Sequence, residues 1–143
     1  MNKEKIRIGK EFIWQMSHRL PFHKGACQNI HGHSYSMRVE LEGETDSNGM
    51  IIDYYDVESI VAPLVAQMDH SFCVDDNDSI MLEFLKKNNF KHYIVPFTTT
   101  AENLTKHILE IIKPKFRNFS NLKKIKVRVN ETADVFAELE EEL

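Results

Sequence analysis

The chain of 143 residues has only two cysteines, Cys27 and Cys73, and it has no long apolar run. Two cysteines form at most one disulfide, which excludes a disulfide-rich secreted scaffold and favours reduced thiols in the cytosol. No run approaches the ~18 apolar residues of a membrane span. The charged start of the chain also lacks the apolar core of a secretory signal. We therefore expect a cytoplasmic protein that does not act in a membrane.

Positive charge is also in short supply. The 18 Lys and Arg residues stand against 22 Asp and Glu residues, which gives a net charge of -4 and a pI near 6.0. This balance argues against a nucleic-acid binder that relies on a broad basic surface. The length is that of one ordinary domain, so we expect residues 1–143 to form a single domain. What the chain has in excess is histidine, with seven residues whose positions need an explanation.

Hydrophobic periodicity indicates strands at both ends of the chain and helices between them. Alternation with period two predicts strands over residues 6–18, 35–41, 125–129 and 135–139. Helical spacing predicts helices over residues 57–68, 78–88 and 104–112. We expect an α+β domain of order ββααββ, with a four-stranded antiparallel sheet and its two long helices on one face. The edges and open face of such a sheet favour self-association.

Several residues are predicted to begin, bend or end the helices. Asp56 is a plausible N-cap of the first long helix, and Asp78 a cap of the short one. Thr99-Thr100-Ala101-Glu102 has the pattern of a capping box, with Glu102 as its acid. Pro63 should bend the first helix, and Pro114 should end the last one.

The strongest chemical feature is His31-Gly32-His33 at the start of a predicted strand. Residues i and i+2 of a strand project to the same face, so the two imidazoles make a chelating pair suited to zinc. His18 ends the first strand with the parity of its buried residues, and antiparallel pairing would bring it beside the other two. Each histidine alone has an ordinary structural explanation. Three together, with no fourth protein ligand, describe a catalytic metal site with an open position.

Other residues that can carry chemistry lie near this motif or at the ends of elements. Cys27 lies four residues before His31 in a polar loop, and it could be a fourth zinc ligand or a general base. Asp69-His70 follows the first long helix, where it is either a polar helix end or a proton shuttle near neutral pH. Glu131 continues the inward parity of the preceding strand, and its carboxylate would suit a ligand with two adjacent N–H donors.

A series of segments in this chain occurs in the order typical of one enzyme family. The segments are Met16-Ser17-His18-Arg19-Leu20, Cys27-x-x-x-His31-Gly32-His33-Ser34-Tyr35, Gly49-Met50-Ile51-Ile52-Asp53-Tyr54, Met68-Asp69-His70, Thr100-Ala101-Glu102-Asn103 and Val129-Asn130-Glu131-Thr132. Together they resemble the 6-pyruvoyl-tetrahydropterin synthase family over residues 12–137. The resemblance is greater to its 6-carboxytetrahydropterin synthase branch, which serves queuosine and 7-deazaguanine biosynthesis.

The resemblance implies the tunnelling fold. In that family three subunits usually join their sheets into a barrel, two such rings stack into a hexamer, and active sites lie at subunit boundaries. The zinc ligands implied by the resemblance are His18, His31 and His33. The implied catalytic residues are the thiol of Cys27 and the proton-transfer dyad Asp69 and His70. The implied substrate-binding residues are Glu131, which would anchor the pterin ring, and Thr100 and Glu102, which would help line its pocket.

The implied reaction is that of a zinc-dependent lyase that converts 7,8-dihydroneopterin triphosphate to 6-carboxytetrahydropterin, acetaldehyde and triphosphate. The Cys-x-x-x-His-Gly-His spacing resembles this branch, and Ala26 stands where a folate-linked branch has a Glu. Arg19, His23 and Lys24 are expected near the triphosphate. The alternatives are the 6-pyruvoyl reaction, without carbon loss, and a non-catalytic pterin- or zinc-binding module. Segment 71–97 departs from the compact members of the family.

Overall fold

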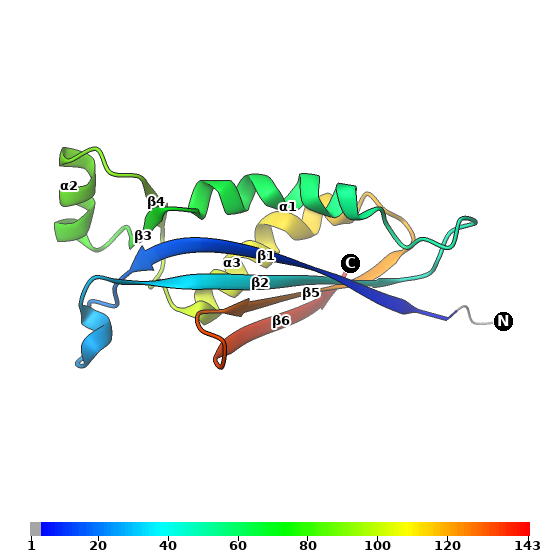
Figure 1. Ribbon diagram of the computed structural model, residues 1–143, viewed down its shortest axis with the longest axis horizontal. Coiled ribbons are helices and arrows are strands. Elements are labelled where there is room, and N and C mark those ends of the chain that lie inside the picture. The colour runs from blue at the N-terminus through cyan, green and yellow to red at the C-terminus, as the bar shows by residue number, and fades with distance from the viewer. Residues whose placement is uncertain (1–3) are drawn as a thin grey trace.

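The computed structural model describes residues 4–143 as a six-stranded sheet with two long helices against one face (Figure 1). The strands are β1 (Ile6–His18), β2 (His31–Gly43), β3 (Ser71–Asp75), β4 (His92–Val95), β5 (Leu122–Asn130) and β6 (Phe136–Glu142). The helices are α1 (Tyr54–Met68), α2 (Ser79–Lys87) and α3 (Ala101–Phe116), and a short 3-10 turn, η1, spans Ala26–Gln28. None of these helices has the length and apolar character needed to cross a membrane.

The strand order is β4-β3-β1-β2-β5-β6, which confirms the α+β class and corrects the sheet. Strands β1, β2, β5 and β6 form the antiparallel part that alternation predicts. Strands β3 and β4 extend it in parallel beside the C-terminal end of β1, so the sheet is mixed and not four-stranded. Strand β3 was missed because four of its five residues are buried. A strand covered on both faces shows no alternation.

The main core lies between the antiparallel sheet and helices α1 and α3. Trp14 of β1 stacks on Tyr35 of β2, with ring centroids 5.3 Å apart and planes within 7°. The two residues are direct partners in the strand register. Burial of each such side chain contributes about 1.5–3 kcal/mol relative to exposure. The core therefore holds the ends of β1 and β2 in a defined register, which is what positions the histidines.

Helix α2 packs elsewhere, against the other face of β3. Phe72 and Val74 of β3 form a separate small cluster with Met81 and Leu85 of α2. Cys73, between them in sequence, belongs to the main core, so the two clusters lie on opposite faces of the strand. The expected short helix is confirmed, with Asp78 as its cap, but Phe84 points outward with 46% exposure.

The predicted ends of the long helices need correction. Asp53, and not Asp56, caps α1, because its carboxylate accepts a hydrogen bond from the Tyr55 amide at 2.8 Å. Helix α3 continues through Pro114 to Phe116. Phe116 is fully buried in the core, and that burial offsets the hydrogen bond lost at Pro114.

The cap of α3 also differs from the predicted box. Thr100 is the N-cap, and its side chain accepts a hydrogen bond from the Asn103 amide at 3.2 Å. Thr99 lies one residue earlier, where it meets His18 instead. The cap differs because of a tertiary contact: the buried His18 imidazole needs a polar partner, and Thr99 supplies it.

Strand β6 runs to Glu142, beyond the predicted end at residue 139. Its acidic residues find basic partners: Glu138 pairs with Lys126 at 3.0 Å, and Glu141 pairs with Lys113 at 2.6 Å. Each of these partly exposed surface pairs contributes at most about 1 kcal/mol. These ion pairs and the backbone pairing with β5 extend β6 to Glu142. The sequence shows no strand alternation there because nearly all residues of the segment are acidic.

Candidate functional site

Strands β1 and β2 bring three histidines together at one end of the sheet. The predicted antiparallel pairing is present: His18 lies opposite His31, and His33 lies opposite Met16. All three share the face on which Tyr35 joins the main core. Their nearest ligand atoms lie within 4.8 Å of one another, so the group can hold a metal ion.

The hydrogen bonds of these histidines leave the right atoms free for a metal. His18 Nδ1 donates to the Thr99 carbonyl at 2.8 Å, and His31 Nδ1 donates to the Asn29 carbonyl at 2.8 Å. A proton held on Nδ1 leaves the lone pair of Nε2 available as a ligand. The Nε2 atoms of His18 and His33 lie 3.2 Å apart. Two nitrogen ligands of tetrahedral zinc, each at ~2.05 Å, would be separated by about 3.3 Å. The donor set fits an ion of this kind.

Burial favours the neutral forms of His18 and His33, as metal binding by an imidazole requires. Burial lowers the pKa of His18 to about 4, although the bond to Thr99 opposes this effect, and the neighbouring histidines lower the pKa further. Burial also lowers the pKa of His33, against the attraction of Glu131. The imidazoles of His18 and His33 are therefore able to bind a cation at neutral pH.

Thr99 is a residue whose contribution to the site was missed. Its carbonyl accepts from His18 Nδ1, and its hydroxyl lies 3.2 Å from the same atom. It is nearly fully buried, at 1% exposure. The two residues are 81 positions apart. No local pattern reveals such a contact, and the sequence alone predicts only a capping role for Thr99.

Glu131 lies directly beyond β5 and next to the histidines. Its Oε2 is 4.0 Å from His33 Nε2, and its side chain is 24% exposed. This distance is too long for a hydrogen bond. The carboxylate is therefore close to the candidate metal centre and remains able to accept N–H donors from a ligand.

Thr100 and Glu102 lie at the start of α3. The Thr100 hydroxyl is engaged as the helix cap, and Glu102 is exposed in the first turn. No hydrogen bond or ion pair within residues 4–143 joins either residue to the three-histidine group. Their assignment to a pterin pocket stays a prediction.

Cys27 lies in η1, in the loop between β1 and β2, and is half-buried as a free thiol. Its carbonyl accepts a hydrogen bond from the Leu20 amide at 2.8 Å, which closes the loop. Among residues 4–143, the set of close ligand atoms consists of the three histidines and does not include Cys27. This geometry disfavours Cys27 as a fourth ligand and leaves the thiol free for other chemistry.

Asp69 and His70 form a hydrogen-bonded pair directly after α1. Asp69 Oδ1 accepts from His70 Nδ1 and from the Gln15 amide, each at 2.9 Å. These two bonds lower the pKa of Asp69, with the Gln15 bond as the larger cause. The His70 amide donates to the Gln15 carbonyl at 2.6 Å. His70 has a φ of 57°, a conformation that costs energy in a residue other than glycine and that is typical of functional sites.

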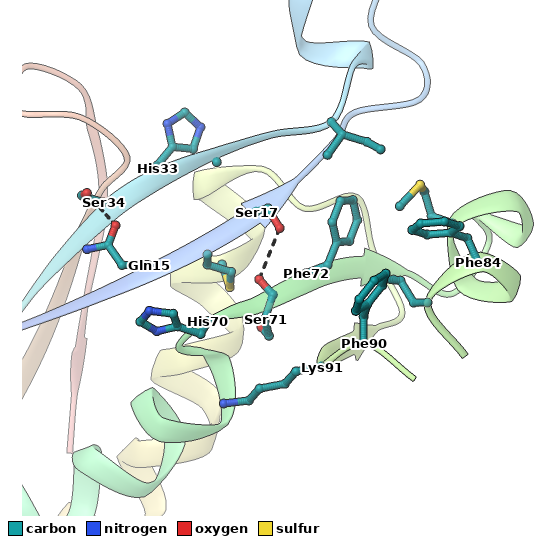
Figure 2. A pocket seen from close by; sticks show the side chains of 15 residues that line it. Gln15, Ser17, His33, Ser34, His70, Ser71, Phe72, Phe84, Phe90 and Lys91 are labelled. Atoms are coloured by element: carbon teal, nitrogen blue, oxygen red, sulfur yellow. Dashed lines mark hydrogen bonds between the residues drawn. The ribbon is translucent and has the colours of Figure 1, made fainter. Parts of the chain in front are cut away.

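The dyad lies apart from the three histidines. It adjoins the outer edge of β1 at Gln15, and the His70 side chain is 75% exposed. No hydrogen bond or ion pair within residues 4–143 joins the dyad to the histidine group. A cavity of about 620 Å³ is bordered by His33 and His70 and extends to Phe72, Phe84 and Phe90 of segment 71–97 (Figure 2).

The three basic residues expected near a triphosphate do not form one cluster of free charge. Arg19 is paired with Asp78, with its Nε 2.7 Å from Asp78 Oδ2. His23 and Lys24 are exposed in the loop before η1. The charge of Arg19 is therefore already compensated within the chain.

Known proteins resemble this chain in sequence and in fold. The family profile described as 6-pyruvoyl tetrahydropterin synthase matches residues 7–142. A 6-carboxy-5,6,7,8-tetrahydropterin synthase of Haemophilus influenzae is 37% identical over 95% of this chain and 99% of its own. An enzyme of the same name from Aquifex aeolicus is 32% identical over 96% and 99%. The fold also matches the 6-pyruvoyl tetrahydropterin synthase structure of Caenorhabditis elegans, with a TM-score of 0.72 and 22% identity over 99% of both chains.

Proposed function

The chain belongs to the 6-pyruvoyl tetrahydropterin synthase family, and we propose that it acts there as a zinc-dependent 6-carboxy-5,6,7,8-tetrahydropterin synthase. The observation that carries this proposal is the group of His18, His31 and His33 with the Glu131 carboxylate beside it. The names of the relatives favour the carboxy reaction over the 6-pyruvoyl one. The product would serve 7-deazaguanine synthesis, including that of queuosine.

The proposed substrate is 7,8-dihydroneopterin triphosphate. Its pterin ring carries a guanidine-like edge with adjacent N–H groups, and Glu131 can accept two hydrogen bonds from such an edge. The 4.0 Å separation of Glu131 and His33 supports a ring bound with its side chain at the histidine group. Ring recognition and chemistry would then be neighbouring parts of one site.

The catalytic roles follow from what each group can do. His18, His31 and His33 would hold the zinc ion, whose chemistry when bound would be Lewis-acid polarisation of the oxygens of the substrate side chain. The Cys27 thiolate would remove a proton from a carbon made acidic in this way. His70, held by Asp69, would transfer protons on the side of the substrate opposite to Cys27. One water molecule is consumed, triphosphate and acetaldehyde leave, and 6-carboxytetrahydropterin is the remaining product.

We infer that a homo-oligomer completes the site. Residues 6–14 of β1 have no strand partner on their outer side within the described chain, and β6 is the last strand at the opposite edge. Unpaired edges of this kind favour strand addition. If β6 of one copy paired along β1 of the next, three sheets would form a barrel, and two barrels could stack as a hexamer. The exposed dyad at the β1 edge could then serve the histidine group of a neighbouring copy.

Product analysis tests the proposed reaction. Zinc-loaded protein is incubated with 7,8-dihydroneopterin triphosphate, and the products are identified by mass spectrometry, with His31→Ala as the metal-deficient control. Formation of 6-carboxytetrahydropterin and acetaldehyde is the expected result. A 6-pyruvoyl product without acetaldehyde would support the alternative enzyme. Zinc binding with no turnover would support a non-catalytic binding module.

A further inference from the structure

Arg19 immediately follows the candidate metal ligand His18, and its side chain reaches into segment 71–97. Its Nε donates to Asp78 Oδ2 at 2.7 Å, and its Nη2 donates to Asp78 Oδ1 at 2.8 Å. This is the two-pronged arrangement that gives an Arg–carboxylate pair its geometric specificity. Asp78 is 7% exposed, and the Arg19 guanidinium lowers its pKa. The pair is therefore well ordered and mostly shielded from water.

The same arginine also contacts the loop that carries Cys27. Arg19 Nη1 donates to the Gln28 carbonyl at 3.4 Å, next to Cys27 in sequence. The Leu20 amide donates to the Cys27 carbonyl at 2.8 Å. Residues 19 and 20 thus hold the carbonyl groups of Cys27 and of the residue that follows it. Each of these contacts depends on where the Arg19 side chain and backbone lie.

The backbone of Arg19 is tied to the metal side of the site as well. Its carbonyl accepts a hydrogen bond from the Thr99 hydroxyl at 3.4 Å, and Thr99 also orients His18. Arg19 therefore contacts three parts of the structure: the α2 cap, the Cys27 loop and the residue that supports a metal ligand. A surface arginine that only bound phosphate would need none of these contacts.

We propose that Arg19 and Asp78 are positioning residues that fix the Cys27 loop relative to the histidine group. This gives segment 71–97 a part in the chemistry, because that segment supplies Asp78. The catalytic consequence rests on the proposed function, whereas the anchoring of the loop can be measured without it. Arg19 acts on the reaction through Cys27 and is not a phosphate ligand.

The test uses Asp78→Asn, Arg19→Lys and the double variant in the zinc-loaded protein. Asparagine keeps a good helix cap while it removes the charge. Lysine keeps the charge but cannot form the two-pronged contact. Glu11→Gln is the matched control, because Glu11 pairs with Arg38 at 2.9 Å on the exposed part of the sheet. Alkylation by iodoacetamide reports Cys27 selectively, since Cys73 is 1% exposed.

Asp78→Asn and Arg19→Lys are each expected to keep the wild-type zinc content and to change the Cys27 alkylation rate several-fold. For turnover, kcat should fall about 10- to 100-fold with KM nearly unchanged, as expected for a misplaced catalytic group. The double variant should be no worse than Arg19→Lys alone, because that substitution already breaks the contact with Asp78. Glu11→Gln should alter neither measurement.

Three experimental results would each overturn the proposal. An unchanged alkylation rate in both single variants would show that the pair does not anchor the loop. A raised KM for the triphosphate substrate in Arg19→Lys, with alkylation unchanged, would make Arg19 a phosphate ligand. Additive losses of kcat in the double variant would show that Arg19 and Asp78 act independently, and this would also overturn the proposal. If the wild-type protein proved inactive, the alkylation series would still decide whether the loop is anchored, independently of the proposed function.

Discussion

Lowering the pH of the metal-free protein should destabilise it through His18. This imidazole is 1% exposed, and its Nδ1 proton is held by the Thr99 carbonyl at 2.8 Å. Its Nε2 faces His33 Nε2 at 3.2 Å, so a second proton would have to enter a buried and crowded space. Burial and the neighbouring histidines consequently lower the pKa of His18 from 6.5 to about 4.

The sign and size of the effect follow from this difference in pKa. Above pH 6.5 His18 is neutral in both the folded and the unfolded chain, so it causes no loss of folding stability. As the pH falls from about 6.5 to about 4, the unfolded chain binds a proton that the folded chain excludes, and stability is lost. At about 1.4 kcal/mol for each tenfold change in proton affinity, the change from 6.5 to about 4 corresponds to a total of about 3 kcal/mol. About 2 kcal/mol of this should be lost by pH 5.

Urea unfolding of chelator-treated protein at pH 7.5 and pH 5 measures this loss. Wild type should lose about 2 kcal/mol more between these values than His18→Gln, which has no titrating ring. The pKa values of His33 and His107 are also lowered by burial, and their effects occur in both proteins and largely cancel. His23→Gln, at an exposed position, should behave as wild type. Equal losses in wild type and His18→Gln would refute the reasoning.

Three further substitutions test other contacts of the site. Cys27→Ala should retain zinc and abolish turnover, as judged by metal analysis and product formation; turnover at the wild-type level would remove the thiol from the mechanism. Asp69→Asn should lower turnover about 100-fold or more with zinc content unchanged, because His70 loses the charge that orients its ring. Lys91→Met should cost about 1 kcal/mol of unfolding free energy in urea, because Lys91 Nζ donates to the Ala66 and Asp69 carbonyls at 2.8 and 2.6 Å. An unchanged unfolding midpoint for that variant would show that these contacts add nothing to stability.

Some of the site could be predicted because its signals are local. The i, i+2 spacing of His31 and His33 places both rings on one face whatever lies around them. The parity of His18 with the buried residues of β1 is equally short-range, and the observed register brings it opposite His31. Glu131 followed from the alternation of β5 in the same way, and it lies 4.0 Å from His33.

Other features depend on contacts that no local pattern contains. Thr99 supports His18 across 81 positions, and Arg19 meets Asp78 across 59. Strand β3 escaped prediction because burial on both faces removes alternation. The cap of α3 moved from Thr99 to Thr100 because Thr99 was required elsewhere.

The amino-acid sequence by itself determined the α+β class, the strands that carry the histidines and the composition of the three-histidine group, because backbone periodicity dictates which side chains share a face. Only the tertiary structure decided how the other candidate catalytic residues lie relative to the three histidines. It holds Asp69 and His70 at the β1 edge through Gln15, apart from the histidine group. It also joins segment 71–97 to the Cys27 loop through Arg19. Such pairings are set by packing between distant segments, and their energies depend on burial that exists only in the folded chain.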